Sequence, residues 1–127
     1  MSSTTPETGI AASAIDDLPT IWDGFAKLVR SGLGISAFGA QIMDLPPDYE
    51  TKSHDEADSG QQELYVGLRG SGAVVTPNGR HPLDVDHLVR VNAGVARTLA
   101  SGPDGLRVLC IGGTPGEAYT PPSWTGA

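Results

Sequence analysis

The sequence predicts an all-β fold, an antiparallel sandwich or barrel with a short helix near its N-terminus. Gly and Pro occur 17 and 10 times among 127 residues, which favours short strands and turns over long helices. Apolar stretches recur about every eight to twelve residues, with turn signals between them. No helical pattern separates these stretches, so we expect the strands to pair antiparallel without crossover helices.

The chain length fits one domain around one core. Residues 1–17, rich in Ser, Thr, Ala and Gly, are predicted to be a disordered leader. Residues 18–127 are predicted to form the single domain, with the barrel core at about 35–114. Within it we expect strands at 35–45, 62–69, 73–76, 83–86, 88–91, 96–100 and 106–111, and turns at 77–79, 92–94 and 103–105.

Apolar residues at helical spacing precede the first expected strand. Asp16 or Asp17 would cap this helix and Gly32 would end it. We expect its apolar face to pack on the sheet or to close one end of the barrel. The apolar residues are Ile21, Trp22, Phe25, Leu28 and Val29.

The charge and the cysteine content of the chain limit which partners and which cellular compartment we expect for the protein. The formal net charge is −7, and six of the acidic residues lie between Asp44 and Asp58. A chain without a basic patch is not expected to bind nucleic acid. The single Cys110 forms no intrachain disulfide and fits a reducing compartment. With neither a signal-peptide pattern nor a membrane-spanning apolar run, the prediction is a cytoplasmic protein without a membrane partner.

The stretch from residue 48 to 70 carries the best candidate site. On an extended strand His54 and Glu56 share one face, because successive side chains alternate. Glu63 opens the clearest apolar strand of the chain. If these two segments pair, one imidazole and two carboxylates converge, which is a donor set that divalent metals accept.

This stretch resembles the first motif of the cupin superfamily, which reads Gly, five residues, His-x-His, a short gap, Glu, six residues and Gly. Asp48 stands at the first glycine, and His54 and Glu56 stand at the two histidines. Glu63 stands at the glutamate and is followed, at the family spacing, by Gly70. The gap before Glu63 is longer than usual, so residues 57–62 contain a small insertion.

The second cupin motif reads Gly, five residues, Pro-x-Gly, two residues, His, three residues and Asn. Its spacing fits the chain from residue 86 to 101, although most of its residue types do not. The corresponding positions hold Asp86, Asn92, Gly94, Arg97 and Ser101. The resemblance covers about residues 35–114 and implies a jelly-roll β-barrel. It leaves the chemistry open, because this fold serves enzymes, binding proteins and storage proteins.

Arg97 occupies the position where metal-binding cupins usually present a histidine, and a guanidinium has no lone pair to donate. In one interpretation His54, Glu56 and Glu63 still bind a divalent metal (Fe, Mn, Ni or Zn), and Arg97 points away or holds a substrate carboxylate. In a second, Arg97 replaces the metal charge and pairs with a glutamate. In a third, the register is shifted by one and Arg97 faces solvent.

The predicted function is binding or transformation of a small organic molecule inside the barrel. His54, Glu63 and Arg97 are the predicted catalytic residues, for metal-assisted or acid–base chemistry of isomerase, cyclase, dehydratase or oxygenase type. The alternative is a binding or sensing cupin without metal or turnover. The resemblance also implies a homodimer, and a purely structural dimerisation module is a third hypothesis. Candidate pocket-wall residues are Phe38, Gln41, Tyr65 and Ile111, whereas His81 and His87 are assigned to turns.

Overall fold

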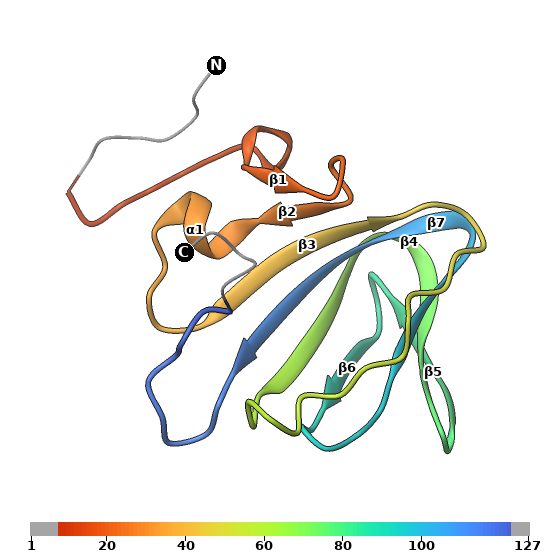
Figure 1. Ribbon diagram of the computed structural model, residues 1–127. Coiled ribbons are helices and arrows are strands. Elements are labelled where there is room, and N and C mark those ends of the chain that lie inside the picture. The colour runs from red at the N-terminus through yellow and green to blue at the C-terminus, as the bar shows by residue number, and fades with distance from the viewer. Residues whose placement is uncertain (1–7, 123–127) are drawn as a thin grey trace.

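The computed structural model describes residues 8–122 and consists almost entirely of antiparallel strands (Figure 1). Hydrogen-bonded strands follow the order β1-β2-β3-β7-β4-β5, and β6 also pairs with β4. The predicted all-β class and antiparallel pairing are confirmed. The strands are β1 (Thr20–Ile21), β2 (Ala26–Leu28), β3 (Gly39–Leu45), β4 (Gln62–Thr76), β5 (Gly79–Asp84), β6 (Leu88–Val91) and β7 (Thr98–Gly113).

The strands form two layers because β4 and β7 are long enough to belong to both. The first half of β4 pairs with β6 and with the second half of β7, which continues to β3, β2 and β1. The second half of β4 pairs with β5 and with the first half of β7. Figure 1 shows both long strands curving, with β5 and β6 on the far side of the fold from β1 and β2. Within the described residues no pairing joins β1 to β5 or β6, so the sheet is not closed.

Two glycines make the corner at which β4 and β7 pass between layers. Gly70 and Gly105 both have a φ of +79°, a conformation that costs other residues strain. A Cβ on Gly70 would collide with the carbonyl oxygen of Gly105. The register here jumps from Gly70↔Leu106 to Gly72↔Ser101. The prediction that residues 103–105 form a turn between two strands is therefore wrong. These residues form a bulge within the continuous strand β7.

The core lies between the layers. Tyr65, Val108 and Cys110 face inward from the first layer and meet Val74 and Leu99 of the second. All five side chains are buried. Alternation along each strand places their neighbours on the outer faces, so the same alternation decides which polar residues point into the interior.

The segment predicted to be helical is mostly extended. Residues 20–28 contain β1 and β2, connected by a turn in which Trp22 and Asp23 have positive φ angles. β2 pairs with β3 in the register Ala26↔Met43, so pairing with an otherwise open sheet edge prevails over the helical spacing. A short helix does follow, α1 (Val29–Leu33), and it ends at Gly34 rather than at Gly32.

Residues 1–7 of the predicted leader lie outside the described residues. A 3₁₀ helix, η1 (Ile15–Asp17), occupies its end, and Arg107 donates a hydrogen bond of 3.0 Å to Asp16. None of the helices in the part of the chain that the structure describes is long and apolar enough to cross a membrane.

We expect Gly70→Ala to destabilise the protein by at least about 1–3 kcal/mol, the cost of a strained φ angle, before the collision with Gly105 is added. Urea unfolding monitored by circular dichroism measures this loss. Gly113→Ala is the matched control, since a Cβ at Gly113 meets no atom within 4 Å. Equal midpoints for the two variants would contradict the proposed role of the corner.

Candidate functional site

The site lies at one end of the space between the layers, where β4 begins. Glu63 is the second residue of β4 and is paired with Gly112 of β7 on one side and Val91 of β6 on the other. Tyr65, two residues later, shares its inward face and is 1% exposed. The strand alternation that buries the tyrosine in the core therefore also points a carboxylate inward.

Arg97 neutralises this carboxylate. Its Nη2 atom donates a hydrogen bond of 2.7 Å to Glu63 Oε1, and its Nε atom donates one of 3.3 Å to the Tyr65 hydroxyl. The Tyr65 hydroxyl in turn donates a 2.6 Å hydrogen bond to the same Glu63 oxygen. Arg97 Nη1 donates to the carbonyl oxygen of Val95 at 2.7 Å. The arginine is only 1% exposed, so each of its three nitrogens is held by the protein itself.

The electrostatic consequence is that Glu63 is ionised near neutral pH. Burial favours the neutral acid, but contacts from His54, Tyr65 and Arg97 outweigh it and lower the pKa of Glu63 to about 2. Burial and the nearby negative charge of Glu63 raise the pKa of the Tyr65 hydroxyl, which remains a hydrogen-bond donor. Burial also raises the pKa of the Cys110 thiol well above its usual range, so this cysteine is not an activated nucleophile.

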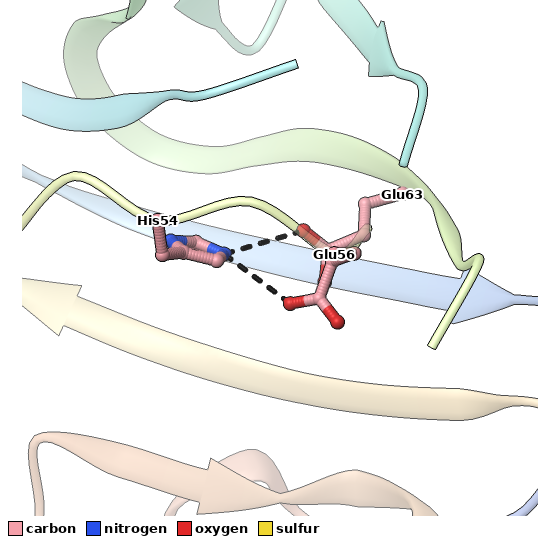
Figure 2. A group of neighbouring side chains, drawn as sticks. All are labelled: His54, Glu56 and Glu63. Atoms are coloured by element: carbon pink, nitrogen blue, oxygen red, sulfur yellow. Dashed lines mark ion pairs between the residues drawn. The ribbon is translucent and has the colours of Figure 1, made fainter. Parts of the chain in front are cut away.

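His54 is brought to the cluster by backbone pairing with Arg97. The amide of His54 donates to the carbonyl of Arg97 at 3.0 Å, and the reverse hydrogen bond is 2.9 Å long. The amide of Glu56 likewise donates to the carbonyl of Ala93. Figure 2 shows the result, with His54 Nε2 directed at both glutamates, 3.4 Å from Glu56 Oε2 and 3.8 Å from Glu63 Oε1.

These three side chains fit a divalent metal in kind and in closeness. They offer one imidazole nitrogen and two carboxylates, with ligand atoms within 4.8 Å of one another. Neighbouring ligands of a metal bound at ~2.1 Å lie roughly 3 Å apart, so small side-chain movements would suffice. The positive charge of Arg97, 2.7 Å from Glu63, opposes a second cation at the same oxygen. The cluster therefore could hold a metal, but the nearby positive charge of Arg97 would make the binding weaker than the same three ligands would give without it.

A cavity of about 120 Å³ adjoins the cluster. Glu56 and Glu63 line it, whereas the half-exposed His54 does not. Its floor is the inner face of β3 and β7, where the paired Gly39 and Gly112 have no side chain and let Tyr119 and Gln61 approach the backbone closely. The other lining residues are Leu28, Arg30, Ser31, Ala40, Gln41, Gln61, Cys110, Tyr119 and Pro122.

The C-terminal segment covers part of this cavity. A Cβ built on Gly39 would meet the Tyr119 hydroxyl at 2.5 Å, so the tyrosine lies directly over that glycine. Tyr119 and Glu56 also line an outer hollow of about 450 Å³. The two spaces share Glu56, Gln61, Tyr119 and Pro122, so they adjoin each other.

The structure brings together the four residues that stand at the histidine and glutamate positions of the two motifs: His54, Glu56, Glu63 and Arg97. Of the three interpretations of Arg97, the second describes the observed pairing with Glu63. A solvent-facing Arg97 and one free to hold a substrate both disagree with its burial.

Among the candidate wall residues, Gln41 lines the cavity and Tyr65 is buried beside it. Phe38 is 39% exposed, and Ile111 faces outward because Cys110 faces in. Arg30 and Tyr119 also line the cavity, and the sequence did not single out either as a site residue because both lie outside the two motifs.

No protein-family model and no curated protein matches the sequence. Solved structures do match. A cupin protein from Bacteroides fragilis has a TM-score of 0.70 at 18% identity, over 90% of this chain and 93% of that one. A cupin-superfamily sugar phosphate isomerase from Silicibacter pomeroyi has a TM-score of 0.61 at 19% identity, over 76% of this chain and 59% of that one.

A predicted oxalate decarboxylase from Thermotoga maritima has a TM-score of 0.57 at 18% identity, over 68% of this chain and 76% of that one. The chain therefore has the cupin fold.

We expect the ionised Glu63 to make stability depend on acid pH. Because its folded pKa of about 2 lies below the ordinary value of 4.5, the stabilisation is complete above pH 4.5 and is lost as pH falls toward 2. The effect is on the order of 3 kcal/mol. Glu63→Gln should be less stable than wild type at pH 7, with a difference that shrinks in acid.

Urea unfolding at several pH values between 7 and 2 measures this difference. Glu50→Gln is the control, since Glu50 is exposed and its difference from wild type should stay constant. A difference between Glu63→Gln and wild type that is independent of pH would mean that Glu63 is not held ionised by its neighbours.

Proposed function

We propose that the protein binds a small organic molecule in the cavity beside Glu56 and Glu63 and transforms it with the help of this cluster. The observation that carries the proposal is the ionised, nearly buried Glu63, which lines the cavity and contacts Arg97 and His54. A buried charge at a concave site is costly to maintain and is typical of binding and catalytic centres. Isomerase, cyclase, dehydratase and oxygenase reactions remain the candidate classes.

The geometry divides the predicted catalytic set into different roles. Glu63 cannot take up a proton near neutral pH, so it serves as a fixed negative charge. Arg97 is a positioning residue, because its covered guanidinium reaches Glu63 and Tyr65 rather than the cavity. His54 supplies an imidazole, the side chain that most often serves as a general acid or base. Glu56 lies 3.4 Å from His54 and lines the cavity, so it connects the imidazole with a bound molecule.

His54, Glu56 and Glu63 are also the residues that would hold a divalent metal. Bound there, Fe, Mn, Ni or Zn would supply a Lewis acid that polarises an oxygen of the ligand. Two of the three residues line the cavity, so a molecule in it would lie next to the ion.

Two of the similar structures carry the names of enzymes, a sugar phosphate isomerase and a predicted oxalate decarboxylase, which support small-molecule chemistry in this fold. A binding or sensing protein without turnover is the alternative. The Arg97–Glu63 pair favours it, because Arg97 balances the charge of Glu63 without an ion. The homodimer and the cytoplasmic location stay predictions.

We expect purified protein to bind about one divalent metal ion per chain. Elemental analysis after expression, and the shift in melting temperature on adding Mn²⁺, Ni²⁺, Zn²⁺ or anaerobic Fe²⁺, measure this. His54→Ala and Glu56→Gln should abolish the shift, whereas His81→Ala, an exposed histidine outside the cluster, should retain it. Absence of both stoichiometric metal and a thermal shift would exclude the metal-assisted form of the proposal and leave the acid–base form.

Ligand binding is tested with metabolite-sized acids, sugars and sugar phosphates, including oxalate and hexose phosphates. We expect at least one to raise the melting temperature of the wild type in a saturable way. Gly112→Val should abolish the effect, because its side chain would collide with Gln61, whose Oε1 lies 2.6 Å from the added Cβ, and displace this cavity-lining residue; Gly113→Val is the matched control on the opposite face. NMR of the recovered compound separates turnover from binding.

A compound that binds equally well to wild type and Gly112→Val occupies some other surface. If every hit behaves in this way, or if no compound binds, the proposed small-molecule function is wrong.

A further inference from the structure

Two polar atoms in the cavity wall lack partners. Arg30 Nη2 and Gln41 Oε1 are covered from solvent and form no hydrogen bond, and they are the two buried side-chain atoms of this kind within residues 8–122. Arg30 belongs to α1 and Gln41 to the inner face of β3. Both residues line the same cavity as Glu63.

Such atoms are rare because a buried donor or acceptor without a partner loses its hydrogen bonds to water. Their coincidence in one cavity therefore points to a molecule that supplies both partners. The contrast with Arg97 is informative, since all three of its guanidinium nitrogens donate hydrogen bonds within the protein. Arg30 is the guanidinium that lines the cavity and still has a donor to offer.

The chemistry of these two atoms specifies the ligand. A guanidinium donor is matched best by a carboxylate, which accepts two parallel hydrogen bonds from its fork. An amide oxygen requires a donor such as a hydroxyl or an amine. The carboxylates of Glu56 and Glu63 in the same wall would repel a second acid group but accept hydrogen bonds from hydroxyls. Burial raises the pKa of Tyr119 and the charge of Arg30 opposes this rise, so the arginine acts on the cavity electrostatically as well.

We propose that Arg30 and Gln41 form the anchor for a small monocarboxylate that carries a hydroxyl or amino group next to its acid group. The carboxylate binds Arg30, and the neighbouring hydroxyl or amine donates to Gln41. This inference rests on the proposed function, because it names the class of ligand for the same cavity. It replaces Arg97 by Arg30 as the group that holds a substrate carboxylate.

The test uses glycolate, lactate and glycine, the plain acid propionate, and the uncharged analogue lactamide, all with EDTA present to remove metal. Binding constants come from chemical-shift titration of ¹⁵N-labelled protein. We expect the hydroxy and amino acids to bind more tightly than propionate, and lactamide to bind weakest. Arg30→Met should weaken carboxylate binding by roughly 10- to 100-fold, the loss typical of a hydrogen bond to a charged group.

Two further variants separate the role of Gln41 from that of Arg30 and control for the loss of a positive charge. Gln41→Met should weaken lactate and glycolate without affecting propionate, because it removes only the acceptor. Arg80→Met, at an exposed position on β5, removes the same charge from the surface and should bind like wild type. Circular dichroism checks that each variant is folded.

Equal binding of lactate and lactamide, no binding of any carboxylate, or equal losses in Arg30→Met and Arg80→Met would overturn the anchor. The broader function would survive that result if other compounds still bound wild type and failed to bind Gly112→Val. The two proposals therefore fail separately.

Discussion

The buried ion pair between Glu63 and Arg97 is the interaction on which the site depends. A carboxylate that points inward from β4 needs a partner, and Arg97 supplies it from the chain segment that leads into β7. Breaking one half of such a pair leaves an uncompensated charge in the interior, which is far more costly than losing a surface pair. Tyr65 and the paired backbone of His54 hold both members in place, so the position of the imidazole follows from the same constraint.

The Glu63–Arg97 pair connects the start of β4 with the segment that precedes β7, and each of these two strands contributes to both layers. Gly70 and Gly105 allow the two strands to turn the corner together, which keeps their backbone hydrogen bonds nearly continuous from one layer to the other. The open end between the layers then receives side chains from β3, β4, β7 and α1 and from the C-terminal segment. A cavity remains at this end, and the charged residues Arg30, Glu56 and Glu63 line it.

Arg97, which stands at the usual histidine position, changes the chemistry that the cluster can perform. It pairs with Glu63, and it is not open to a ligand. The remaining guanidinium of the cavity, Arg30, comes from a helical turn outside both cupin motifs. A motif comparison locates the carboxylates and the imidazole correctly, but it cannot find a residue that the family pattern does not include.

The sequence by itself determined the all-β class and the antiparallel pairing, because alternation and turn signals are local properties of the chain. The sequence also predicted that His54, Glu56 and Glu63 converge, but it left open where Arg97 points. It failed for residues 20–28, where pairing with β3 outweighs helical spacing, and for the bulge at 103–105, where turn-forming residues bend a strand instead of ending it. Only the tertiary structure decided that Arg97 is covered and that Arg30 and Tyr119 border the cavity. Those facts depend on contacts between segments far apart in the chain, which no local pattern encodes.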